Sequence, residues 1–157
     1  MKRAYEIAVM AIVSIIIISS GYFGMSAGKY VGVILFASGF IPLIAAELAR
    51  LEMKRLTPDI AFGVIDTGLL TIFALLGGHL YGVLGAVVFG VVGDSVTDGI
   101  AGFFEGGVAV WLRGKGIEES RLPLGSGLGK LCGCLLISGI VLTAATLLGV
   151  GVEGLKI

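Results

Sequence analysis

Apolar residues run along this chain in five long stretches that carry few charges or none. Three of the stretches contain no Asp, Glu, Lys or Arg: 7–28, 30–46 and 131–152. The stretch 60–78 is interrupted by Asp66 alone, and the stretch 80–112 carries Asp94, Asp98 and Glu105. A helix needs roughly 20 apolar residues to cross the ~30 Å hydrocarbon core of a bilayer. These runs are too long for the strands of a barrel, the other structure that satisfies its backbone in lipid, so they predict membrane-spanning helices.

The pattern predicts an all-α protein: a polytopic membrane helix bundle of five transmembrane helices in a single domain over 1–157. The expected helices cover about 4–28, 30–50, 59–78, 80–112 and 128–152. As one helix, 80–112 would be ~50 Å long, and it could instead turn back around 93–99.

Basic residues favour a single crossing by 80–112, because cytoplasmic loops are enriched in Lys and Arg. With five crossings and the N-terminus inside, nine of the eleven basic residues fall inside: Lys2, Arg3, Arg50, Lys54, Arg55, Arg113, Lys115, Arg121 and Lys130. A hairpin would move four of them outside. The C-terminus is therefore expected outside.

Composition agrees with a membrane protein. Hydrophobic residues make up 57% and charged residues 14%, and the mean hydropathy is +1.07. Soluble domains are nearer one quarter charged. Eleven basic and eleven acidic residues give no net charge, which argues against nucleic-acid binding. Cys132 and Cys134 are too few for a secreted disulfide framework and are expected to pack as small residues.

Three aspartates lie within the expected third and fourth helices, where charge is costly and usually functional. A very short turn around His79 should make these helices an antiparallel pair. Counted outward from that turn, Asp66 and Asp94 lie within ~3 Å of the same depth, and Asp98 follows Asp94 by one turn on the same face. A ridge of small residues continues this face and allows close helix approach: Gly82, Ala86, Gly90 and Gly102.

The acids and their neighbouring hydroxyls predict a cation site. Carboxylates crowded together in a low dielectric cannot all stay ionised without protons or a cation. Hard oxygen ligands suit calcium, magnesium, manganese or sodium. The candidate ligands are Asp66, Asp94, Asp98, Ser95, Thr97 and Thr67. We expect a bound or transported cation, no resident cofactor and no catalytic residue.

A structural interpretation of the same acids is the alternative. Asp94 and Asp98 could lie at the inner headgroups, solvated or paired with basic loops. Asp66 favours the cation site, because a buried acid needs a partner and Asp94 lies level with it. Glu105 is expected beyond the crossing, in the cytosol.

Three short blocks resemble, in order, the motifs of the transmembrane protein 65 family over about 62–140. The blocks are Phe62-Gly63-Val64-Ile65-Asp66, Gly93-Asp94-Ser95-Val96-Thr97-Asp98 and Gly129-Lys130-Leu131-Cys132-Gly133. The resemblance implies a protein linked to sodium–calcium exchange, with Asp66 and Asp98 as the matching acids and Thr97 in place of a serine.

Departures from that family are specific. Thr67 and Asp94 stand where the family has asparagines, so this site would be more acidic. A family glutamate falls on Ala109, while Glu105 is out of register. The family occupies the mitochondrial inner membrane in animals, but the chain shows no Arg/Ser-rich transit peptide, which favours a prokaryotic cell membrane.

The leading hypothesis is therefore a cation transporter, for a calcium-like divalent cation with sodium or proton exchange. Five helices make a thin wall around a pathway, so a parallel homodimer in the lipid bilayer is expected. One alternative is a membrane scaffold or regulator that binds a partner through its glycine ridges. Another is an enzyme resembling CDP-alcohol phosphotransferases, although Asp94 and Asp98 are four residues apart where that motif has three. The resemblance to vacuolar-type iron transporters is fainter.

Overall fold

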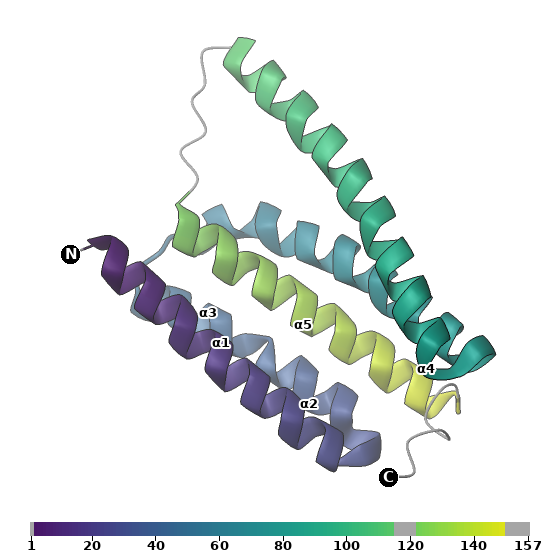
Figure 1. Cartoon of the computed structure of the whole chain (residues 1–157). Helices are drawn as coiled ribbons and strands as arrows, with labels where there is room; N and C mark the ends of the chain where they lie inside the picture. Colours follow the sequence, from purple (N-terminus) through teal and green to yellow (C-terminus); the bar gives the residue numbers. More distant parts are fainter. Residues whose placement is uncertain (1, 115–121, 150–157) are drawn as a thin grey trace.

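The computed structural model describes residues 2–114 and 122–149, which form helices and no strand (Figure 1). In chain order these are α1 (Lys2–Ser26), the short 3-10 helix η1 (Gly28–Tyr30), α2 (Val31–Ser38), α3 (Phe40–Leu48), α4 (Met53–Gly114) and α5 (Pro123–Leu147). Four helical stretches in this part of the chain are long and apolar enough to cross a membrane: Arg3–Ser26, Gly28–Leu48, Met53–Ile100 and Pro123–Leu147. The predicted all-α class is confirmed, and the helices are compatible with a membrane bundle.

Large apolar side chains cover the outside of the molecule. Ile18 is 71% exposed and Val83 is 84% exposed, and they are typical of many others. The buried core is small by comparison: Val13, Ala46, Leu56, Leu124 and Leu128. Because a water-soluble helix places polar residues on its outer face, this surface is suited to lipid.

α4 reverses direction at Gly82, which divides it into a first arm (53–81) and a second arm (83–114). Gly82 has φ 66°, a left-handed conformation that glycine adopts at low cost. The expected turn around His79 is therefore wrong by about three residues. The two nearer glycines, Gly77 and Gly78, are used in packing instead: a Cβ at Gly77 would overlap the backbone of Gly85, and one at Gly78 would touch the Ala86 Cβ. Beyond Gly82 the second arm is one continuous helix, as favoured for 80–112.

Three other helix boundaries differ from the expected ones. The expected helix 30–50 is interrupted at Gly39, because Pro42 cannot donate to the carbonyl four residues earlier. The expected helix 59–78 begins earlier, at Met53, with Pro58 tolerated in its second turn. The expected helix 128–152 begins at Pro123, a residue suited to a first helical turn, and residues 150–152 lie outside the described part of the chain.

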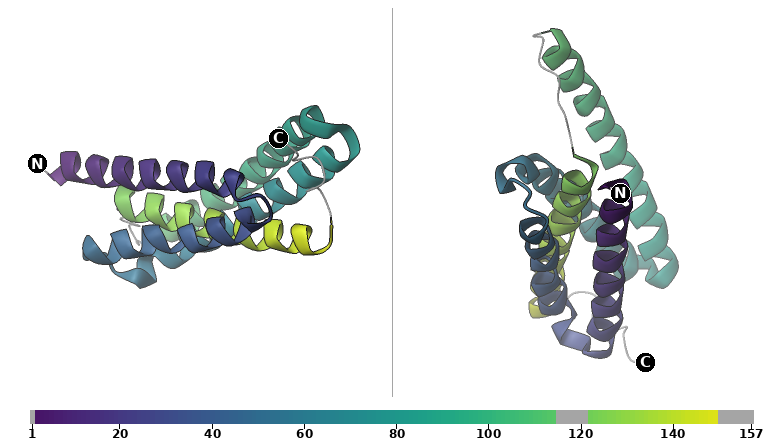
Figure 2. Two further views of the ribbon diagram at one scale, coloured as in Figure 1. Left: turned by 90° about the horizontal axis from the view of Figure 1, so that it is seen from below. Right: turned by 90° about the vertical axis from the view of Figure 1, so that its left-hand side faces the viewer.

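α5 is the centre of the bundle. It packs between α2 and the first arm of α4, while α1 lies against α2 and α3 (Figures 1 and 2). Glycines allow these close approaches: a Cβ at Gly133 would overlap the Ile60 carbonyl, and one at Gly139 would overlap the backbone of Phe36. The second arm of α4 instead leaves the bundle at an angle (Figure 1).

Candidate cation site

Small residues set the register between the two arms of α4. A Cβ at Gly90 would lie 3.6 Å from the Ala74 Cβ, and one at Gly78 would lie 3.4 Å from the Ala86 Cβ. Gly93 is covered by the ring of Phe73. The predicted ridge therefore faces the first arm at Ala86 and Gly90. Gly82 lies in the turn, and Gly102 has nothing within 4 Å.

This register brings Asp66 to Thr97. The Thr97 hydroxyl lies 2.7 Å from Asp66 Oδ1, to which it donates a hydrogen bond across the two arms. Thr97 is buried at 6% exposure, and its Oγ1 also lies 3.1 Å from the Gly93 carbonyl and 3.0 Å from the Asp94 carbonyl. Because the turn is at Gly82, Asp66 lies level with Thr97 and not with Asp94, which corrects the predicted depth match.

Asp94 and Asp98 lie beside this contact with different exposure. Asp94 is half-buried and Asp98 is exposed. On the second arm Asp94 lies three residues before Thr97 and Asp98 directly follows it, so the three carboxylates share one region. Among the side chains described, however, no three His, Cys, Asp or Glu residues are placed to hold a metal ion together.

The remaining predicted ligands lie outside the contact. Ser95 is exposed and donates to the Val91 carbonyl 2.8 Å away, within its own helix. Thr67 lies one turn before Thr71, whose hydroxyl is 3.2 Å from the Ser138 hydroxyl of α5, so Thr67 is on the face of the first arm that meets α5. The side chain of Glu105 lies outside the described part of the chain. The structure thus joins Asp66 and Thr97 directly, brings Asp94 near them, and separates Ser95 and Thr67 from them.

A polar ladder between the first arm of α4 and α5 was not predicted. Ser126 Oγ lies 2.9 Å from Asp59 Oδ2, and the Thr71 and Ser138 hydroxyls are 3.2 Å apart. Thr67 and Cys134 occupy the intermediate positions on the two helices. The two residues of each hydrogen-bonded pair are 67 positions apart in the sequence, because the two helices run parallel. The signal was present in the sequence, as polar residues recurring at helical spacing in both segments.

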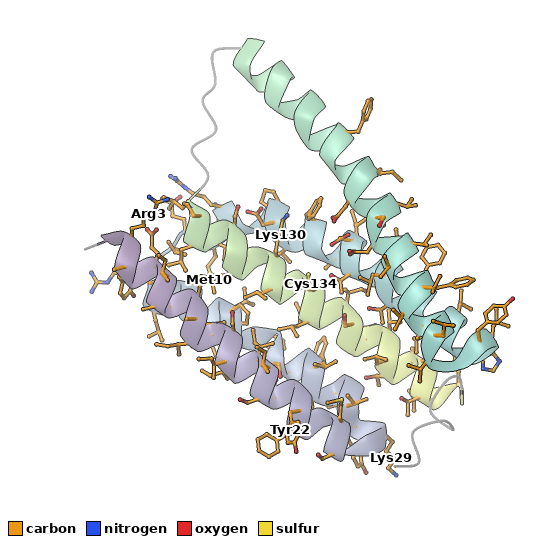
Figure 3. All side chains as sticks on the ribbon, viewed as in Figure 1. Arg3, Met10, Tyr22, Lys29, Lys130 and Cys134 are labelled. Atoms are coloured by element: carbon orange, nitrogen blue, oxygen red, sulfur yellow. The ribbon has the colours of Figure 1, made fainter. Side chains whose placement is uncertain are left out.

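Lys130 of α5 contacts the first arm of α4 through an aromatic ring. Its Nζ lies 4.2 Å from the centroid of the Phe62 ring. Figure 3 shows Lys130 and Cys134 one turn apart on α5. Phe62 lies one turn before Asp66 on the first arm of α4, so a cation held against an aromatic face stands one turn from that acid.

The described oxygens can serve a hard cation. Asp66 and Asp94 provide carboxylates, and Thr97 provides a hydroxyl, which are ligand types preferred by calcium and magnesium. Cys134 is the one soft donor beside them. A comparison of this chain with known protein families, curated proteins and solved structures finds no match.

Proposed function

We propose that this chain is a membrane cation transporter in which Asp66, Asp94 and Asp98 bind the ion as it passes. The observation that carries the proposal is the hydrogen bond between Asp66 and Thr97 at 2.7 Å. It holds a half-buried carboxylate between two arms of a helix whose residues are mostly apolar. Acids inside membrane helices are rare and mark ion pathways.

The ion we propose is a divalent, calcium-like cation, exchanged for sodium or protons. Asp66 and Asp94 offer two carboxylates near one hydroxyl, and Asp98 stands one turn further along α4. A divalent cation would relieve the mutual repulsion of carboxylates held close together in a low dielectric. Exchange follows if both ions compete for the same carboxylates.

The proposed assembly is a parallel homodimer in a cell membrane, with five crossings and the N-terminus inside. The exposed Asp98 supports a partner, because a carboxylate facing lipid is costly. The second arm that carries it leaves its own bundle at an angle (Figure 1). A second copy could cover this arm.

Calcium uptake into proteoliposomes tests the transport proposal. Asp66→Asn and Asp94→Asn should reduce uptake to near the level of empty liposomes, because each removes a negative charge. Asn at position 66 can still accept the Thr97 hydrogen bond, so the fold should persist. Glu47→Gln, an exposed acid at the end of α3, is the matched control. Wild-type uptake in both aspartate variants would refute the proposal.

A scaffold without transport is the second candidate. Gly99 and Gly102 on the second arm have nothing within 4 Å, and open glycines can accept a partner helix. Two variants distinguish a scaffold from a transporter. Gly99→Leu should abolish association with a partner helix in a scaffold, while Asp66→Asn should leave that association unchanged.

A further inference from the structure

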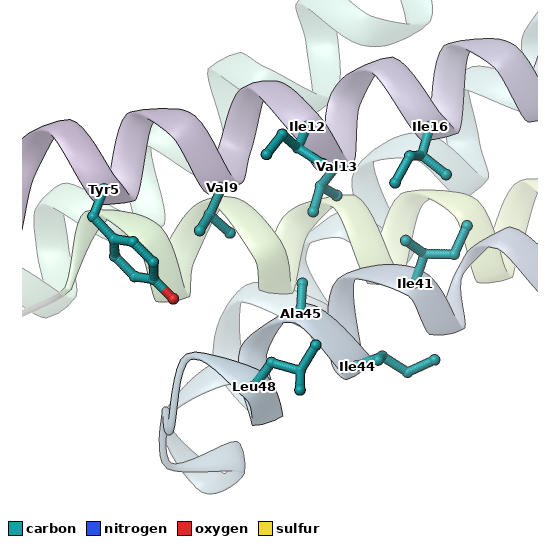
Figure 4. A pocket seen from close by; sticks show the side chains of 9 residues that line it. All are labelled: Tyr5, Val9, Ile12, Val13, Ile16, Ile41, Ile44, Ala45 and Leu48. Atoms are coloured by element: carbon teal, nitrogen blue, oxygen red, sulfur yellow. The ribbon is translucent and has the colours of Figure 1, made fainter.

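Lys130 is the one charged side chain on α5, a helix that is long and apolar enough to cross a membrane. It lies seven residues after Pro123, which is roughly 10 Å along the helix. Elsewhere in the bundle, the groove between α1 and α3 is lined by Tyr5 and aliphatic side chains, none of them charged (Figure 4). A lysine inside a membrane helix is costly and needs a partner for its charge, so the neighbours of Lys130 decide what it can do.

The ammonium of Lys130 rests on the ring of Phe62, with Nζ 4.2 Å from the ring centroid (Figure 3). Lys130 is exposed, and the one salt bridge among the described residues joins Arg55 to Glu52. The aromatic face is therefore the partner that the structure gives to this cation. A cation–π contact at an exposed site shifts an equilibrium by only about two- to fivefold, so another partner can compete for the ammonium.

Asp66 lies within reach of the same side chain. The backbone of Lys130 packs on Gly63, where a Cβ would lie 2.6 Å from the Lys130 carbonyl oxygen. Asp66 follows Gly63 by three residues, which is roughly 4.5 Å along the helix, and the four-carbon stem of a lysine spans about 6 Å. Phe62 and Asp66 are four residues apart, on one face of the first arm. Rotation of the stem can therefore carry Nζ from the ring to the carboxylate.

The carboxylate of Asp66 has an oxygen to offer the ammonium. Thr97 donates its hydrogen bond to Oδ1, and an ionised carboxylate accepts hydrogen bonds on both of its oxygens. A lysine ammonium carries three donors and no acceptor. An ion pair between Lys130 and Asp66 is thus compatible with the contact that holds the two arms of α4 together.

We propose that Lys130 is a tethered counter-cation: its ammonium pairs with Asp66 when the transported cation has left, and withdraws to the ring of Phe62 when that cation binds. Carboxylates in a low dielectric need a compensating positive charge, and a lysine on α5 supplies it without leaving the protein. The structure shows the withdrawn position of the side chain. Phe62 is a positioning residue, because it acts on the ion only through Lys130. The inference rests on the proposed transport for the incoming cation, whereas the pairing of Lys130 with Asp66 does not.

Unfolding of the purified full chain in detergent, with a chelator present, tests the pairing without any divalent ion. Lys130→Gln should raise the unfolding equilibrium constant about two- to fivefold more in the wild type than in Asp66→Asn, because only the wild type can lose the ion pair. Lys130→Arg keeps the positive charge and should restore the wild-type constant. An equal effect of Lys130→Gln in the two backgrounds would overturn the inference.

Equilibrium dialysis of calcium against the same protein tests the change of partner. Phe62→Leu removes the aromatic face, leaves Lys130 at Asp66 for more of the time, and should weaken calcium binding about two- to fivefold. Phe62→Tyr keeps an aromatic face and should bind calcium as the wild type does. In Lys130→Gln, the further change Phe62→Leu should have no effect on calcium binding.

The outcomes separate this inference from the proposed function. Equal weakening by Phe62→Leu with and without the lysine would overturn the role of Lys130 and leave transport standing. A wild type that binds no calcium would refute the proposed ion, and the unfolding measurement would then decide the pairing alone. If Phe62→Leu does not fold, the Lys130 and Asp66 variants decide, because they leave the ring in place.

Discussion

Replacing Thr97 with valine would test whether the contact between the arms of α4 holds Asp66 in place. Valine keeps the shape of the side chain and removes the hydroxyl that donates to Asp66 Oδ1 over 2.7 Å. A hydrogen bond to a charged group contributes ~1.5–3 kcal/mol, because its loss leaves the acceptor desolvated. The unfolding equilibrium of the purified chain in detergent should therefore shift by roughly 10- to 150-fold.

Thr97→Ser is the matched control, since it keeps the hydroxyl and loses one buried methyl group, ~1 kcal/mol. Equal destabilisation by the valine and serine variants would refute the reasoning. A double-mutant cycle with Asp66→Ala gives an independent readout. The two residues should couple by at least ~0.5 kcal/mol, as contacting residues do. If Thr97→Val costs the same with and without Asp66, the hydrogen bond contributes nothing.

Three further variants test the packing and charge around the acids. Gly133→Ala should lower stability by ~1–3 kcal/mol in detergent unfolding, because its Cβ would overlap the backbone of α4, whereas Gly99→Ala, in open space, should be neutral or slightly stabilising. Gly82→Ala should cost ~1–3 kcal/mol in the same assay, because φ 66° with ψ −153° is a backbone conformation essentially restricted to glycine. An unchanged stability would contradict this. Lys130→Gln should tighten calcium binding roughly two- to tenfold in equilibrium dialysis, because it removes a nearby positive charge. The exposed Lys54→Gln should not change calcium binding, and weaker binding in Lys130→Gln would contradict the prediction.

The hydrophobic pattern predicted the helical class because each apolar run was long enough to decide between helix and strand. It could not place the turn between the third and fourth stretches. Gly77, Gly78 and Gly82 are all suitable turn residues, and the choice depends on which glycines the packed arms need. Gly77 and Gly78 pack against Gly85 and Ala86, and Gly82 forms the turn. Contacts between the two packed arms cannot be read from the local sequence.

The same cause explains what was missed in the site. The shift of the turn brings Thr97 to Asp66 and leaves Ser95 exposed. The faces of the first arm could have been separated from the sequence, because Thr67 and Thr71 recur at the spacing that pairs them with α5. Which face meets which neighbour is a tertiary property. Asp66 and Thr67 are adjacent in sequence, yet one faces the second arm and the other faces α5.

The acids lie where the close packing of α4 ends. From the turn to Gly93 the arms meet through glycines, alanines and the ring of Phe73, and the Asp66–Thr97 hydrogen bond lies beyond them. Beyond it, Gly99 and Gly102 have nothing within 4 Å. In the proposed transporter an ion would therefore reach the carboxylates from the end of the bundle that carries Arg3 and Arg50. The packed glycines block the other side, since a Cβ at Gly77 would overlap the backbone of Gly85. Release to that side requires the arms to separate near Gly82, so a cross-link between positions 78 and 86 should stop transport while leaving binding intact.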